Sequence, residues 1–193
     1  MPHKFDTRQR ANLLSEERAA ELHPAELLRS LGLKAGDTFA DIGCGPGFFT
    51  IPAAEIVGEK GRVFAGDIQG EMLSAVTGRI KEHGLSNVRV FKTSDMDVPL
   101  PAGCADLALL AFTLNEVEHR ARFLHRVGRL LKPDAQLAVI EWEKLSEAEG
   151  PPQQDRLSPE ELSQDAIAAG LRVVDGRKLN DHHYLSLFAL AHT

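Results

Sequence analysis

The fold of this chain is decided by the stretch Thr38-Phe39-Ala40-Asp41-Ile42-Gly43-Cys44-Gly45-Pro46-Gly47-Phe48-Phe49. A short apolar run leads into it and a helical pattern leads out of it, which predicts a strand, a glycine turn and a helix. Three alternate glycines let the backbone turn sharply there and let a ligand approach closely, because glycine has no Cβ. Asp41 ends the strand, and in an open α/β sheet ligands bind outside the carboxyl ends of the strands. We therefore expect this loop to form the floor of a ligand site.

The glycine spacing separates two kinds of cofactor loop. Dinucleotide-binding loops have G-x-G-x-x-G, which seats a pyrophosphate on the helix N-terminus. Here the third glycine comes one residue early and gives D-x-G-x-G-x-G, which disfavours a nicotinamide oxidoreductase. The motif resembles the first motif of the class I S-adenosylmethionine-dependent methyltransferases, [D/E]-x-G-x-G-x-G, whose cofactor has no phosphate. The resemblance implies S-adenosyl-L-methionine as cofactor and contacts to it from Asp41, Gly43, Cys44, Gly45 and Gly47. The alternative is a tight turn that holds nothing.

Composition and charge bound the class of protein. At 193 residues the chain suffices for one domain with a substantial core. A formal net charge of −6 makes a nucleic-acid partner unlikely, because phosphate binding relies on Lys and Arg. The start Met1–Asp6 lacks the apolar core of a signal peptide, and the apolar run Leu107–Leu114 is too short to span a bilayer. Cys44 and Cys104 give neither a disulfide framework nor metal spacing. We therefore expect a cytoplasmic monomer or homodimer with no membrane partner and no metal.

The second strand supplies the next candidate site residue. A helix over Phe48–Val57 is followed by the strand Arg62–Gly66, which ends at Asp67, twenty residues after Gly47. In cofactor-binding βαβ units an acidic residue at this place takes a ribose hydroxyl. We assign Asp67, with Ile68 beside it, to the cofactor. The alternative is a carboxylate that only ends a strand.

The third strand leads to a polar loop. A helix over Gly70–His83 and a strand over Asn87–Phe91 precede Thr93-Ser94-Asp95-Met96. Asp95 resembles the acidic residue that, in this methyltransferase family, accepts a hydrogen bond from the adenine amino group. Met96 would then lie against the ring, with Ser94 beside it. The alternative is an ordinary polar loop.

The rest of the chain predicts further alternation of strands and helices. The apolar run Ala105–Ala111 is typical of a central parallel strand, and Phe112 at its carboxyl end is assigned to the cofactor. The remaining predicted elements are a helix over Phe123–Leu131, a type I turn at Leu131–Ala135, a strand over Gln136–Trp142, a helix capped by Ser158 that runs to Ala169, a strand over Leu171–Val174 and a last strand over Tyr184–Ala191.

This order resembles the methyltransferase fold: a doubly wound α/β protein with a mostly parallel seven-stranded sheet, whose last strand is antiparallel and inserted beside the fifth. Residues 1–36 predict a helical segment, either a lid or a solvated leader, before a cofactor-binding domain over 37–193. The tail after Glu141 is similar to small bacterial methyltransferases grouped with those of ubiquinone biosynthesis.

Methyl transfer from a sulfonium is an in-line displacement, so it depends on orientation and needs a base only if the acceptor loses a proton. The last strand would start near Asn115, Glu116 and Trp142, and would bring His182, His183 and Tyr184 there. Adjacent residues of a strand face opposite sides, so we favour His183 as the base, with Glu116 next. We expect a small-molecule acceptor, by elimination. The alternatives are a surface loop without a role, a macromolecular acceptor, and a cofactor-binding partner subunit without activity.

Overall fold

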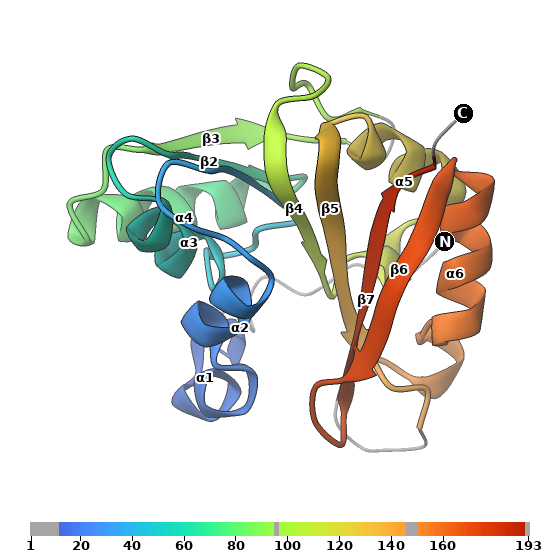
Figure 1. The fold of residues 1–193 in the computed structure, drawn as a ribbon. Coiled ribbons are helices and arrows are strands. Elements are labelled where there is room, and N and C mark those ends of the chain that lie inside the picture. The colour runs from blue at the N-terminus through green and yellow to red at the C-terminus, as the bar shows by residue number, and fades with distance from the viewer. Residues whose placement is uncertain (1–11, 95–96, 146–149, 192–193) are drawn as a thin grey trace.

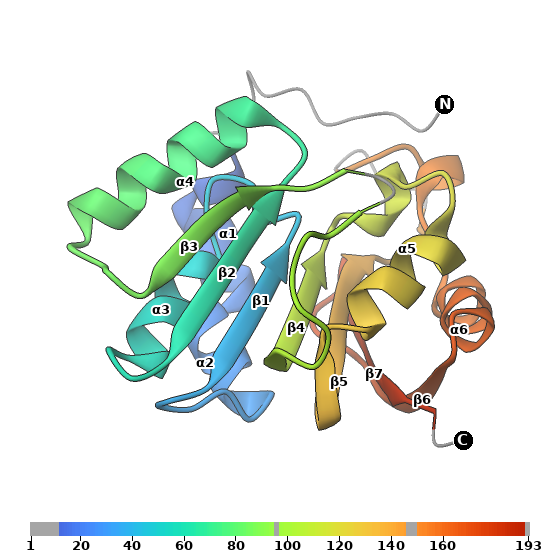
Figure 2. The ribbon, with the colours of Figure 1, turned by 90° about the horizontal axis from the view of Figure 1, so that it is seen from above.

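The computed structural model describes residues 12–94, 97–145 and 150–191. Seven strands form one sheet in the order β3-β2-β1-β4-β5-β7-β6 (Figure 2). The strands are β1 (Thr38–Ile42), β2 (Arg62–Asp67), β3 (Val88–Lys92), β4 (Ala105–Ala111), β5 (Leu131–Trp142), β6 (Leu171–Lys178) and β7 (His183–Leu190). The first five are parallel, and β7 lies antiparallel between β5 and β6. The predicted fold class is therefore confirmed.

Helices cover both faces of the sheet. The α-helices are α1 (Glu16–Leu22), α2 (Pro24–Ser30), α3 (Thr50–Val57), α4 (Gly70–Glu82), α5 (Arg120–Gly128) and α6 (Pro159–Ala168), with short 3-10 turns η2 (Asn12–Leu14), η3 (Leu114–Glu116) and η4 (Gln153–Asp155). Alternate residues of β4 divide between the two faces: Leu107 and Leu109 pack with α1–α3, while Ala108 and Leu110 pack with α5 and α6 (Figure 1). This two-sided burial explains the continuous apolar run of β4.

The sheet order places the ligand crevice. From β1 the chain continues outward to β2 and β3, and then crosses to β4 on the other side of β1. Adjacent crossovers therefore leave opposite faces of the sheet and open a gap between β1 and β4. Ligands of doubly wound sheets bind at this switch point, outside the carboxyl ends of the strands.

The boundary between α5 and β5 differs from the sequence prediction. The helix begins at Arg120 and ends at Gly128, and β5 starts at Leu131, where a turn was predicted. The pairing with β4 moves from Ala105↔Leu131 to Leu107↔Gln136. Between these two pairs β5 advances by five residues while β4 advances by two, so β5 carries a bulge. This bulge accommodates Pro133, which has no N–H to donate to a strand ladder. The predicted type I turn is therefore wrong, although Pro133 does interrupt the regular pairing.

The described part of the N-terminal segment packs against the body of the protein. Leu22, Leu27 and Leu28 are buried in one cluster with Phe39 of β1 and Phe48 of the glycine loop. Figure 1 shows α1 and α2 as a pair next to α3. Residues 12–36 are therefore a structured layer on the face of the sheet that α3 covers.

Candidate active site

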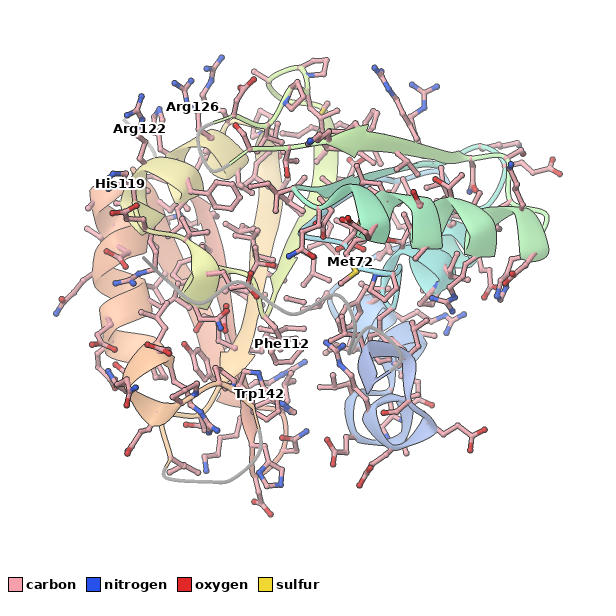
Figure 3. All side chains as sticks on the ribbon, turned by 180° about the vertical axis from the view of Figure 1, so that it is seen from behind. Met72, Phe112, His119, Arg122, Arg126 and Trp142 are labelled. Carbon is pink, nitrogen blue, oxygen red and sulfur yellow. The ribbon has the colours of Figure 1, made fainter. Side chains whose placement is uncertain are left out.

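A cavity of about 800 Å³ lies at the carboxyl ends of the central strands. Its lining combines the glycine loop, the strand ends of the sheet and the N-terminal helix α1. The lining residues used below are Leu13, Arg18, Asp41, Gly43, Cys44, Gly45, Phe48, Asp67, Ile68, Met72, Ser94, Phe112, Asn115, Glu116, Trp142 and His183. Figure 3 shows Met72, Phe112 and Trp142 along this opening, between the α1 side and the strands of the sheet.

Two glycines of the loop are required for different reasons. Gly43 has φ +79°, and a Cβ there would lie 2.3 Å from the hydroxyl oxygen of Thr113, so this glycine lets the loop pack against the segment after β4. Gly45 has φ +52°, and a Cβ there would meet only a methyl of Leu13, at 3.8 Å. Gly45 therefore faces the cavity, and a side chain there would extend into it.

Asp67 connects the end of β2 to the glycine loop. Its Oδ2 accepts a hydrogen bond from the Gly45 N–H at 2.9 Å, and its Oδ1 accepts one from the Gln69 N–H at 2.8 Å. Burial raises the pKa of this carboxyl, and the backbone N–H groups around it oppose that rise. Each oxygen keeps a lone pair for a further donor. Ile68 lies beside it in the lining.

Asp41 is a buried carboxyl at the end of β1. The Thr50 hydroxyl donates to its Oδ2 at 2.6 Å, and burial raises its pKa to about 7. A cationic ligand next to this side chain would stabilise the ionised form. Cys44 lies next to it along the loop, and burial raises the pKa of its thiol well above the ordinary value.

The third strand end contributes Thr93 and Ser94 to the lining. Asp95 and Met96, the residues predicted to contact adenine, lie outside the described residues. Met72 of α4 faces the same cavity and is buried, with 3% of its surface exposed. The sequence predicted only a helix over Gly70–His83 here, so the place of Met72 in the cavity was missed.

Three rings form one wall of the cavity. The His183 ring lies 4.4 Å from Trp142 and 5.0 Å from Phe112, measured between ring centroids, and the Phe112 and Trp142 centroids are 5.7 Å apart. Strand pairing causes this contact, because Trp142 of β5 is opposite His183 of β7. Phe112 has φ +58°, a left-handed conformation that a bulky residue adopts only when its surroundings impose it. This cluster is called the aromatic wall below.

Glu141 of β5 supports the segment that follows β4. Its buried carboxylate accepts the Leu114 N–H at 2.9 Å, and further backbone N–H groups from Thr113 and Asn115 also lower its pKa. Burial is the larger effect and raises the pKa of Glu141 to about 8. Asn115 and Glu116, both in the cavity lining, are therefore carried by a turn that Glu141 holds in place.

Some predicted neighbours of the site lie elsewhere. The Tyr184 hydroxyl donates to the Leu157 carbonyl at 2.7 Å, so this residue faces away from the cavity, and its expected place on the rim is wrong. His182 is not among the lining residues, whereas its neighbour His183 is. The opposite directions of His183 and Tyr184 follow from the alternation of side chains along β7, whereas His182 precedes the strand.

The remaining charged groups of α5 lie apart from the cavity. Figure 3 shows His119, Arg122 and Arg126 on the outer side of α5, far from Phe112 and Trp142. The hollow near His119 measures about 420 Å³, and its floor is formed by the ion pair between Arg120 and Asp165, 2.6 Å apart. Within the described ranges, no group of three or more His, Cys, Asp or Glu side chains is placed to hold a metal ion.

The seven-stranded sheet and the D-x-G-x-G-x-G loop at its switch point define the class of protein: a Rossmann-like S-adenosylmethionine-dependent methyltransferase. The model of the ubiE/COQ5 methyltransferase family matches residues 14–150. The chain therefore belongs to the ubiE/COQ5 methyltransferase family, an enzyme family whose members use S-adenosylmethionine. The family predicted from the glycine loop is confirmed.

Individual relatives agree with this assignment. A solved S-adenosylmethionine-dependent methyltransferase from Aquifex aeolicus is 34% identical, with a TM-score of 0.91 over 96% of this chain and 98% of that one. The ubiquinone/menaquinone biosynthesis C-methyltransferase UbiE of Vibrio vulnificus is 32% identical over 114 residues, 58% of this chain and 44% of that protein. The chain thus spans about half the length of the curated relatives it matches. The [4+2]-cyclase SpnF shares the fold, with a TM-score of 0.77, at 18% identity over 98% of this chain and 86% of that one. No helix in the described part of the chain is long and apolar enough to cross a membrane.

Proposed function

We propose that this chain transfers the methyl group of S-adenosylmethionine to a small-molecule acceptor by in-line displacement. The observation that carries the proposal is one cavity, of about 800 Å³, that joins the glycine loop and the strand-end carboxylates to the aromatic wall. The volume falls within the range of roughly 300–1,000 Å³ that is usual for small-molecule sites. Cofactor and acceptor would thus share one space.

The cofactor half of the cavity fits the chemistry of S-adenosylmethionine. Gly45 leaves the loop open to the methionine portion, and the free lone pairs of Asp67 suit the two ribose hydroxyls. Asp41 supplies a buried carboxylate for the positive charge of the ligand. We assign Gly43, Cys44, Ile68, Ser94 and Phe112, and with them Asp95 and Met96, to the same subsite. Gly47, which the sequence also predicted to contact the cofactor, is not among the lining residues, and a Cβ there would lie 2.6 Å from a methyl of Val76, so this glycine lets the loop pack against α4.

The acceptor half is assigned to the aromatic wall and the turn after β4. Rings with a few polar groups suit a small planar acceptor. When the cofactor is bound, it supplies an activated methyl group, and the residues of this chain have to orient the acceptor carbon or heteroatom in line with it. His183 would accept a proton from the acceptor, and Glu116 is the second candidate.

The names of the relatives indicate which acceptors to test first. Several are named C-methyltransferases of ubiquinone and menaquinone biosynthesis, so hydroxylated quinols are the first acceptors to test. A planar quinol ring would stack on Phe112 or Trp142, which lie 5.7 Å apart at one side of the cavity.

Two measurements test the proposal. Calorimetry should detect micromolar binding of S-adenosylmethionine and of its demethylated product; no heat with either ligand, together with binding of NADH, would overturn the assignment. Transfer of a labelled methyl group is then measured with a panel of quinols and with a metabolite extract. Binding without turnover on any acceptor would favour a partner subunit without activity, and label only in protein or RNA would favour a macromolecular acceptor.

Five further proposals accompany this function. We propose a lid role for residues 1–36 and a cofactor-binding domain over 37–193. A cytoplasmic location, a monomeric or homodimeric state and the lack of a nucleic-acid partner also stay predictions.

A further inference from the structure

Arg18 is the one cationic side chain that α1 contributes to the cavity lining. The N-cap of the helix places it, because the Ser15 hydroxyl accepts the Arg18 N–H at 3.2 Å. Its guanidinium lies between two rings, 4.7 Å from the centroid of Phe48 and 4.9 Å from that of Phe112. Arg18 therefore connects the N-terminal segment with the glycine loop and with the segment after β4.

The side chains described around Arg18 do not neutralise its charge. Desolvation lowers its pKa to about 10, and its Nη1 donates a hydrogen bond to the Leu13 carbonyl, 3.0 Å long. In residues 12–94, 97–145 and 150–191, no carboxylate forms an ion pair with it. Buried charges are usually paired, because an isolated one costs several kcal/mol in lost hydration.

Neighbouring acids do not fill this role. Glu17 and Glu21 of the same helix are exposed. The Asp41 carboxyl accepts the Thr50 hydroxyl, and that of Asp67 accepts two backbone N–H groups. A ligand with an anionic group therefore fits next to Arg18, close to Phe48 and the end of the glycine loop.

We propose that Arg18 binds the α-carboxylate of the methionine portion of S-adenosylmethionine, and that α1 thereby closes on the bound cofactor. This inference rests on the proposed function. A guanidinium can hold a carboxylate with two parallel hydrogen bonds. Phe48 and Phe112 keep its plane oriented for that contact through cation–π stacking.

The anion could also belong to an acidic acceptor, and the choice of ligands separates the two sources. S-adenosylhomocysteine carries the amino-acid carboxylate, whereas 5′-methylthioadenosine has the same nucleoside without it. The test measures the affinity of both ligands by calorimetry for the parent, Arg18→Met and Arg18→Lys. Arg29→Met is the matched control, because Arg29 is an exposed residue of α2 and does not line the cavity.

We expect Arg18→Met to lower the affinity for S-adenosylhomocysteine by roughly 10- to 150-fold, the usual scale for a hydrogen bond to a charged group. The affinity for 5′-methylthioadenosine should stay close to that of the parent, because this ligand lacks the carboxylate. Arg18→Lys keeps the charge without the planar fork, so it should lose part of the affinity. Arg29→Met should bind both ligands like the parent.

Three outcomes would overturn the inference. Unchanged S-adenosylhomocysteine affinity in a folded Arg18→Met variant would mean that the carboxylate lies elsewhere. Equal weakening of both ligands would assign Arg18 a purely structural role between Phe48 and Phe112. Unchanged cofactor affinity with a raised KM for an acidic acceptor would assign the anion to the acceptor. A parent protein that binds neither ligand would instead contradict the proposed function itself.

Discussion

Asp67 combines a structural role with its proposed binding role. It accepts the Gly45 and Gln69 N–H groups, and the ribose hydroxyls would use its remaining lone pairs. We expect Asp67→Ala to weaken the binding of S-adenosylhomocysteine by roughly 1.5–3 kcal/mol. The variant lacks a charged hydrogen-bond acceptor for the ligand, and the glycine loop loses its hydrogen bond to the Asp67 carboxylate.

Asp37→Ala is the control for this change, since Asp37 also accepts a backbone N–H, from Lys34 at 3.0 Å, and is half-buried just before the other end of β1. Calorimetry of both variants checks the prediction. If Asp67→Ala binds as tightly as the parent, Asp67 is a turn residue only, and Gln69 or a backbone group holds the ribose.

Substitution of the two loop glycines should affect different properties, cofactor binding at Gly45 and stability at Gly43. Gly45→Val puts a side chain into the cavity, so we expect cofactor binding to be abolished while the fold survives, at a strain of about 1–2 kcal/mol for the left-handed backbone. Gly43→Val places its Cβ on Thr113, where the added atom would be 2.3 Å from the hydroxyl oxygen, so it should lower the melting temperature much further. Calorimetry and thermal unfolding separate the two effects. Parental affinity in a folded Gly45→Val variant would show that the loop does not touch the ligand.

The proposed role of His183 as a general base is tested by a substitution that removes the imidazole but keeps most of the side-chain volume. The ring is buried against Trp142 and Phe112, so His183→Ala would leave a hole, and His183→Gln is the better variant. With an acceptor in hand, turnover should fall by about 10²–10⁴-fold, the usual contribution of a general base, while cofactor affinity stays nearly unchanged.

His182→Gln is the control, because His182 precedes β7 and does not line the cavity. Turnover and a pH profile equal to those of the parent would make His183 a packing residue. The acceptor would then lose its proton to Glu116, or would already be a good nucleophile.

At the scale of elements, two helices offer a matched pair of caps. Ser15 caps α1 and Ser158 caps α6, each accepting an N–H at 3.2 Å. Either serine changed to alanine should cost about 1 kcal/mol of local helix stability. If α1 is a lid, Ser15→Ala should also weaken cofactor binding severalfold, and Ser158→Ala should leave it unchanged. Binding that is equal in the two variants would argue against the lid.

Local signals in the sequence predicted most helices and strands. They failed where pairing with a distant strand determines the bounds of an element. The capping box of α6 and the buried run of β4 appear as predicted, because each depends on neighbouring residues. The start of β5 was missed because its bulge forms only against β4. The edge strand β6 extends to Lys178, past the apolar residues that predicted it, because pairing with β7 continues it.

The same distinction applies to the candidate site. Asp41 and Asp67 could be placed from the sequence, since each is one of the last two residues of an apolar strand and parallel strands end at one edge. Arg18 and Met72 reach the cavity from helices that carry no motif for it, and Phe48 follows the glycine motif without being part of it. Only the packing of α1 and α4 on the sheet reveals them.

At the scale of the whole molecule, buried carboxyls should make stability depend on pH. The folded pKa is about 7 for Asp41 and about 8 for Glu141, against ordinary values of 3.8 and 4.5. Between these limits the folded state binds more protons than the unfolded state, so the free energy of unfolding falls as pH rises. Asp106 and Glu161 have lowered pKa values, so they change the free energy of unfolding only at acidic pH, below the ordinary pKa of a carboxyl.

We therefore expect the protein to be less stable at pH 8.5 than at pH 5.5, by at least about 1 kcal/mol for each carboxyl whose pKa is raised by one unit or more. Glu141→Gln keeps the size of the side chain and one oxygen for the Leu114 N–H but does not titrate, so the difference between the two pH values should shrink. Urea unfolding at both pH values measures this. Glu143→Gln, a change of a half-buried carboxyl that directly follows β5, controls for the lost charge. Stability that rises with pH over this interval, or a Glu141→Gln variant with the full parental difference, would mean that Glu141 is ionised in the folded protein. Its carboxylate would then hold the turn after β4 as an anion, with the backbone N–H groups of that turn outweighing the cost of burial.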